Sequence, residues 1–81
     1  MPKAVTVRYF AVLREKRGTD QETVTTGADT ARALYAELAE RHGFTLSPDI
    51  VRVSINDQFR NWDTPVSERD CVAFIPPVAG G

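Results

Sequence analysis

Three features that many proteins have are scarce or missing in this sequence. Cys71 is the only cysteine among 81 residues, which excludes an internal disulfide and any metal site built from several cysteines. No apolar run approaches the roughly 20 residues of a transmembrane helix. The formal net charge is −1, without the basic excess expected of a nucleic-acid-binding protein. We therefore expect a reducing compartment and no binding to membranes or nucleic acids.

The composition that remains is typical of a small globular protein. Hydrophobic residues make up 42% and charged residues 26% of the chain. The length predicts a single domain over residues 1–81 with room for one site at most. The first ten residues alternate in polarity and do not form a charged stretch followed by an apolar block. We therefore expect no secretory signal and a cytoplasmic location.

Alternating apolar residues predict several β-strands. The stretch "KAVTVRYF" has two different faces, Val5, Val7 and Tyr9 against Thr6, Arg8 and Phe10. The stretch "ETVTT" is expected to pair with it as a hairpin, after a turn that contains Gly18 and Asp20. Two later stretches alternate in the same way, "IVRVSIN" at 50–56 and "CVAFI" at 71–75. In the last of them, Val72 and Phe74 share one face, and Cys71, Ala73 and Ile75 share the other.

One segment predicts an amphipathic helix, "DTARALYAELAERHG" at 29–43. Its apolar residues fall at helical spacing and form one stripe, Ala31, Leu34, Tyr35, Leu38 and Ala39. Asp29 or Thr30 is suited to cap its start, and Gly43 to end it in a left-handed conformation. The order of hairpin, helix and two or three further strands predicts an α+β fold with one main helix on one face of a mixed sheet. The β-grasp, or ubiquitin-like, fold has this order, with its first and last strands side by side at the centre.

The chain ends in "FIPPVAGG", which predicts a projecting tail over residues 76–81. Pro76 and Pro77 remove two N–H donors and fix φ, so the last strand cannot continue its ladder beyond Ile75. The tail is expected to be extended at its root and flexible beyond it, and from Pro77 to Gly81 it reaches roughly 17 Å.

The two terminal glycines favour a chemical role for the α-carboxyl group of Gly81. Without Cβ atoms, Gly80 and Gly81 fit a narrow channel and let a partner's backbone approach the terminal carboxylate. An ionised carboxylate is a poor electrophile, so it must first be activated, for instance as an acyl-adenylate made with ATP. A sulfur or nitrogen nucleophile then displaces AMP. The alternative is an ordinary frayed chain end, where small residues also collect.

Four stretches carry a resemblance to a known family. "VAFIPPVAGG" resembles the end of molybdopterin synthase small subunits, sulfur carriers of the ThiS/MoaD family, and "VRYFAVLREKRGTD" resembles their start. "VSIND" and "VSERDCVAF" are similar to their third strand and to the entry to their last strand. The similarity spans nearly the whole chain, and the Pro-Pro-Val-x-Gly-Gly ending is specific. Thiazole-synthesis carriers share the fold and the Gly-Gly but generally lack the Pro-Pro.

The resemblance implies a sulfur-transfer cycle. An adenylating enzyme similar to a ubiquitin-activating enzyme uses ATP to activate Gly81, and a sulfur donor protein then supplies the sulfur of a thiocarboxylate. The tail enters the large catalytic subunit of a heterotetramer, where sulfur moves to a cyclic pterin precursor to form the molybdopterin dithiolene. On this reading the chain is a sulfur-donor subunit that is not an enzyme alone and binds no cofactor or metal itself.

The predicted partner surface lies on the sheet face away from the helix. Phe10 and Ile75 are expected there, uncovered and apolar. The resemblance adds Phe59, while Arg8 and Arg14 are candidates for a polar rim, with simple solvation as the alternative. Tail residues complete the predicted contacts: Pro76, Pro77 and Val78. Cys71 is expected to be a plain strand residue.

Two further aromatic side chains are expected to have structural roles. Trp62 is expected to fill a gap under its loop, and His42 to suit the helix dipole without acting as a ligand or base. The arginines and lysines of residues 1–17 outnumber the acids, which fits either an edge for an acidic partner or a solvated rim.

Other functions stay open from the sequence. These are sulfur delivery for thiazole synthesis or tRNA thiolation, a ubiquitin-like modifier that forms isopeptide bonds with lysines, and a ubiquitin-like interaction module without terminal chemistry. Carrier and modifier both need a free terminal glycine, and the passive module does not.

Overall fold

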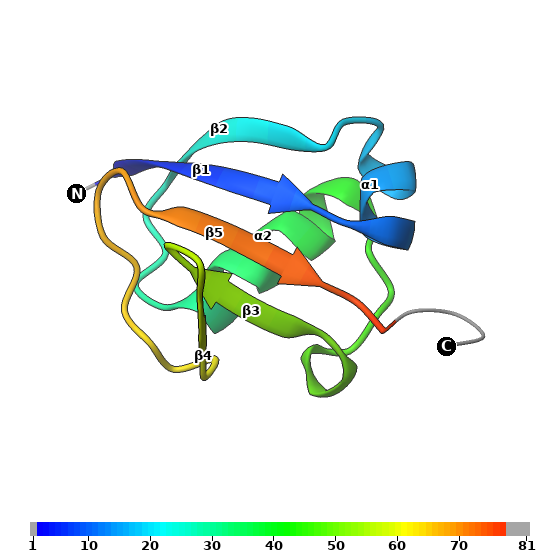
Figure 1. Cartoon of the computed structure of the whole chain (residues 1–81). Coiled ribbons are helices and arrows are strands. Elements are labelled where there is room, and N and C mark those ends of the chain that lie inside the picture. Colours follow the sequence, from blue (N-terminus) through cyan, green and yellow to red (C-terminus); the bar gives the residue numbers. More distant parts are fainter. Residues whose placement is uncertain (1, 78–81) are drawn as a thin grey trace.

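The computed structural model describes residues 2–77, which form one twisted five-stranded sheet with a helix across one face (Figure 1). The order across the sheet is β2-β1-β5-β3-β4. The strands are β1 (Lys3–Tyr9), β2 (Gln21–Thr26), β3 (Arg52–Ile55), β4 (Gln58–Arg60) and β5 (Cys71–Ile75). β1 pairs with β2 in antiparallel fashion and with β5 in parallel. The predicted mixed sheet, with the first and last strands adjacent, is confirmed.

The inner face of the sheet packs on helix α2 (Ala31–His42), as the alternation of apolar residues predicted (Figure 1). Val7 and Phe74 are fully buried, and so are Leu34 and Leu38 of the helix. The helical stripe is confirmed, since its five members are all buried or half-buried. Burying an aliphatic or aromatic side chain contributes about 1.5–3 kcal/mol, so the contact between helix and sheet is the main source of stability.

A cluster of aromatic rings fills the core at the β3 side of α2. The ring centroid of Tyr35 lies 5.1 Å from that of Phe74 and 5.3 Å from that of Trp62. The Trp62 ring stacks on Phe74 at 5.9 Å. Trp62 is half-buried and packs against the core, which confirms the expectation that it fills a gap under its loop. The Tyr35 hydroxyl donates a hydrogen bond to the Leu46 carbonyl, so the phenol is satisfied while its ring is buried.

The connection between β1 and β2 contains a second helix, which the sequence interpretation missed. Residues expected to form only a turn build α1 (Ala11–Arg17). Leu13 is its one buried residue and anchors it to the core. Arg14, Lys16 and Arg17 lie in its last turn, where cations interact favourably with the helix dipole. A helix of seven residues with a single buried side chain shows no periodicity to detect.

Two details of the chain between α2 and β5 also differ from the sequence interpretation. The third strand was expected over 50–56, but it spans Arg52–Ile55, because a 3-10 turn occupies Pro48–Ile50. Ser47 caps this turn, with its hydroxyl accepting a hydrogen bond from the Asp49 N–H. β4 lies within the stretch that was expected to be irregular and pairs with β3.

The ends of α2 follow local rules that the sequence predicted. Thr30, and not Asp29, caps the start, with its hydroxyl oxygen accepting a 3.2 Å hydrogen bond from the Ala33 N–H. At the other end, Gly43 has φ +75° and its N–H donates to the Ala39 carbonyl at 2.8 Å. A side chain at this φ is strained even where space is available.

We therefore expect Gly43→Ala to destabilise the protein by about 1 kcal/mol, because alanine must adopt a left-handed backbone there. Gly27→Ala is the matched control, since a Cβ at Gly27 meets no atom within 4 Å and its φ lies outside the left-handed range. The control is expected to leave stability unchanged or slightly raised. Urea unfolding of both variants measures the difference. Equal midpoints would show that Gly43 has no special role at the helix end.

Candidate functional site

The sheet face opposite α2, called the outer face below, has no helix over it among the described residues (Figure 1). The strand register defines its rows. Arg8 of β1 lies opposite Ala73 of β5, which in turn lies opposite Ser54 of β3. Ser54 is paired with Phe59 of β4. The central small residues, Ala73 and Ser54, are 7% and 8% exposed, so the larger side chains around them cover much of their surface.

The next row lies at the end of the sheet from which the chain leaves β5. Ile75 is half-buried and lies opposite Arg52. Phe10, directly after β1, is also half-buried. Because Ile75 and Phe10 follow the paired residues Phe74 and Tyr9, the parallel pairing of β1 and β5 brings them side by side. The structure thus places two predicted contact residues together at the root of the tail.

Each half of the outer face carries an arginine stacked on an aromatic ring. The guanidinium carbon of Arg8 lies 5.2 Å from the centroid of the Phe10 ring. That of Arg52 lies 5.7 Å from the Phe59 ring. Such cation–π contacts hold both partners in place, and a stacked guanidinium keeps its N–H donors free in the ring plane. Phe59 is 64% exposed, the largest exposure among the large apolar side chains of the described residues.

Other predicted contact residues have mixed outcomes. Arg14 is exposed on α1, the helix that follows β1, and its assignment to the rim stays a prediction. Pro76 is buried and Pro77 is exposed, so the first residue of the predicted tail still packs against the body of the protein. A proline ring is apolar and its nitrogen has no N–H, so its burial leaves no donor unpaired. Val78, Gly80 and Gly81 lie outside the described residues.

Arg52 was missed by the sequence interpretation. The signal was present, because Arg52 alternates with the buried residues Val51 and Val53 as Arg8 alternates with Val7 and Tyr9. Both arginines therefore point to the outer face. Cys71 lies on the same face, half-buried beside Thr6, as a plain strand residue.

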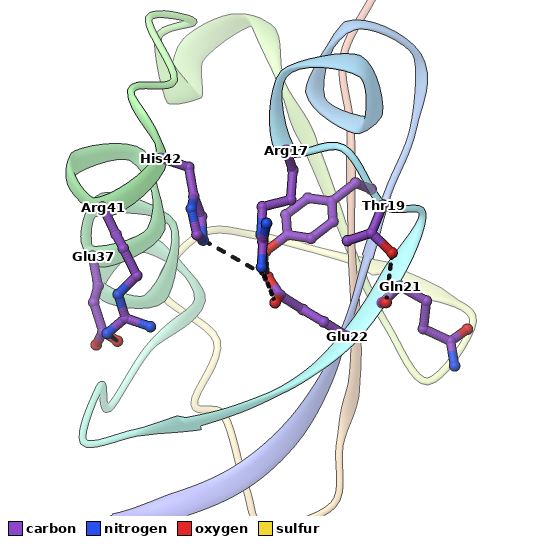
Figure 2. Close-up of polar contacts among 8 residues, drawn as sticks. Arg17, Thr19, Gln21, Glu22, Glu37, Arg41 and His42 are labelled. Carbon is purple, nitrogen blue, oxygen red and sulfur yellow. Dashed lines mark hydrogen bonds and ion pairs between the residues drawn. The ribbon is translucent and has the colours of Figure 1, made fainter.

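A cluster of polar side chains fixes α1 against the start of β2 and the end of α2 (Figure 2). The Arg17 guanidinium donates two hydrogen bonds to the Glu22 carboxylate, at 2.7 and 3.0 Å. The Tyr9 hydroxyl donates to the same carboxylate at 2.6 Å. The His42 Nε2 lies 3.7 Å from it, in line with a role at the helix end. Four elements thus meet at Glu22, which holds α1 directly after Phe10 at the end of β1.

These contacts shift the pKa values of the cluster. The hydrogen bonds from Arg17 hold the pKa of the Glu22 carboxyl below its usual 4.5. Desolvation is the largest cause that lowers the pKa of His42 below 6.5, and the positive charges of Arg17 and Arg41 lower it further. The negative charge of Glu22 acts in the opposite direction. Burial and the hydrogen bond to Glu22 raise the pKa of Tyr9, so its hydroxyl stays a donor at neutral pH.

The cluster predicts two separate steps of acid destabilisation. A lowered pKa in the folded state means that the unfolded state binds the proton first, so stability falls as the pH falls. For His42 the loss begins near its unfolded pKa of 6.5, and for Glu22 it begins near 4.5. His42→Gln is expected to flatten the upper step of the pH dependence. Glu22→Gln is expected to flatten the lower step and to deepen the upper one, because the Glu22 charge opposes the lowering of the His42 pKa. Urea unfolding from pH 7.5 to 3 measures both, and an unchanged profile in either variant would refute the assignment for that residue.

Two features are absent from the described residues. Residues 2–77 contain no group of three or more His, Cys, Asp or Glu side chains placed to hold a metal ion. Within the same range, no helix has the length and apolar character needed to cross a membrane.

Strand order, one main helix and a central last strand define this chain as a ubiquitin-like β-grasp protein, as the sequence predicted. Residues 7–81 match the model of the ThiS family, and the chain belongs to that family. It is 34% identical over 80 residues to the molybdopterin synthase sulfur carrier subunit of Escherichia coli K12, with 95% of this chain and 99% of the relative covered.

Two solved structures are similar to the chain over nearly its whole length. A putative molybdopterin converting factor subunit 1 from Pyrococcus furiosus is 30% identical with a TM-score of 0.75, over 94% of this chain and 99% of that one. A complex of subunits 1 and 2 of the molybdopterin-converting factor from Helicobacter pylori contains a chain that is 29% identical, with a TM-score of 0.64. That match covers 96% of this chain and 99% of the other.

Proposed function

We propose that this chain is the sulfur-carrier small subunit of a molybdopterin synthase. Support comes from its similarity to the Escherichia coli sulfur carrier subunit and from the Gly-Gly ending after two prolines. The structural observation that carries the proposal is the position of β5. This strand is hydrogen-bonded on both sides, to β1 and to β3, and it ends at Ile75, beside Phe10. The body therefore presents the chain end from its most firmly held strand.

The chemistry of the proposed cycle uses the α-carboxyl group of Gly81. A carboxylate oxygen attacks the α-phosphate of ATP on an adenylating enzyme, which gives an acyl-adenylate and releases pyrophosphate. Hydrosulfide supplied by a donor protein then displaces AMP from the acyl-adenylate, which leaves a thiocarboxylate. In the large subunit the thiocarboxylate sulfur attacks a carbon of the pterin precursor and displaces an oxygen substituent from that carbon, which joins the chain end to the pterin as a thioester. Hydrolysis of the resulting acyl bond leaves sulfur on the pterin and restores the carboxylate, and two such transfers complete one dithiolene.

The outer face is proposed as the docking surface for the large subunit. Phe10, Ile75 and Phe59 supply its apolar area, with Arg14 at the rim, and the tail follows from Pro77. The structure of the Helicobacter pylori relative with its second subunit supports such a two-subunit assembly. Exposed aromatic side chains at the centre of an interface account for most of the binding free energy in many complexes.

The first test measures the chain end. Incubation with the adenylating enzyme, ATP and a sulfur source is expected to replace one terminal oxygen with sulfur, which intact-mass spectrometry detects. The control is a variant with one extra residue after Gly81, which is expected to keep its mass because the glycine carboxyl is no longer terminal. High-molecular-weight lysine conjugates without any thiocarboxylate would instead indicate a protein modifier. A chain left untouched by ATP would indicate a passive module.

The second test measures the docking surface. Phe10→Ala combined with Ile75→Ala is expected to weaken binding to the large subunit by at least about tenfold, because two apolar contacts beside the tail are lost. The matched control is Arg32→Ala combined with Glu40→Ala, two exposed positions on α2, which lies on the other face of the sheet. Calorimetric titration compares them. Equal affinities for both double variants would remove Phe10 and Ile75 from the interface.

A further inference from the structure

The charges on the outer face are all of one sign. The pairing register places eleven strand residues on this face around the buried Ala73. They are Ala4, Thr6, Arg8, Gln21, Thr23, Thr25, Arg52, Ser54, Phe59, Cys71 and Ile75. Arg8 and Arg52 are the only charged residues among them, and no Asp or Glu belongs to this set. The chain as a whole is slightly acidic, with a net charge of −1, so this face is positive against an acidic background.

Neither arginine has an acidic partner within the described residues. The ion pairs there use other cations, Arg17, Arg32, Arg41 and His42. Arg8 and Arg52 instead stack on Phe10 and Phe59, which orders the guanidinium groups and leaves their N–H donors available. A preordered guanidinium loses less side-chain entropy when it binds a carboxylate than a freely rotating one.

Arg8 and Arg52 lie on the two strands that flank β5, the strand that carries Ala73 and Ile75. Arg52 is opposite Ile75, and Arg8 is opposite Ala73, two residues earlier on the same strand. With strands about 4.8 Å apart and about 3.3 Å per residue, the Cα atoms of Arg8 and Arg52 are separated by roughly 12 Å. A single protein surface can therefore reach both arginines while it covers Ile75.

We infer that the outer face docks on a partner surface that presents carboxylates to Arg8 and Arg52 around an apolar centre that covers Ile75. The inference rests on the proposed function and specifies the chemistry of the large subunit at this contact. Arginine binds a carboxylate through two parallel hydrogen bonds, which fixes the orientation of the partner as well as its distance. Charge complementarity also argues against a second copy of this chain as the occupant. Two such faces would bring arginines together with no acid between them.

The test is a titration of the full-length chain with its large subunit at 50 mM and 300 mM salt. Arg8→Gln combined with Arg52→Gln is expected to weaken binding about tenfold at low salt and to remove most of the salt dependence, because screened charge attraction is lost. Arg8→Lys with Arg52→Lys keeps both charges, so it is expected to keep the salt dependence while binding less tightly.

The matched control is Arg32→Gln combined with Arg41→Gln, which removes two positive charges on α2, away from the outer face. It is expected to retain the affinity and salt dependence of the unaltered chain, and urea unfolding verifies that all variants fold. An Arg8/Arg52 variant that binds like the control would overturn the inference and leave the proposed function standing. No binding by the unaltered chain would overturn both. Absence of the thiocarboxylate in the mass measurement, with binding intact, would count against the proposed function alone.

Discussion

The parallel pairing of β1 with β5 is the constraint on which the candidate functional groups depend. Parallel strands run in the same direction, so the residues that follow the two strands lie at the same end of the sheet. Phe10 and the α1 helix follow β1, and Pro76 and Pro77 follow β5. A fold that paired these strands in antiparallel fashion would place the aromatic residue and the tail root at opposite ends. The pairing of β1 with β5 therefore places two segments that are distant in sequence, those after β1 and after β5, next to each other on one surface.

The polar cluster around Glu22 extends this constraint to α1. A seven-residue helix with one buried side chain has little packing of its own, and isolated helices of this length are not stable. The bidentate contact from Arg17 and the hydrogen bond from Tyr9 attach its last turn to β2 and to the core. Glu22 occupies an inward-facing position in its strand, where an apolar residue would be ordinary. The cluster explains why a carboxylate stands there.

The elements that could be predicted from the sequence are those whose signal repeats. Buried positions repeat every second residue in β1, at Val5, Val7 and Tyr9, and at helical spacing in α2. The sequence therefore predicts which face of each element is turned to the core. The α1 helix has only Leu13 as an inward residue, and the burial of Pro76 depends on what surrounds it. The outward position of Arg52 could be read from its alternation with Val51 and Val53, but its stacking on Phe59 and the role of Glu22 depend on partners from other strands and helices. Such tertiary relations have no local pattern from which they could be inferred.

The position of β5 also has a mechanical consequence. A carrier whose end is withdrawn from a tight channel is pulled along the axis of its last strand. The hydrogen bonds from β5 to β1 and β3 lie across that axis, so tension loads them in shear and together, whereas an edge strand pulled sideways would peel one bond at a time. In the proposed cycle, in which the tail enters and leaves the large subunit, this arrangement resists unfolding of the body better than an edge strand would.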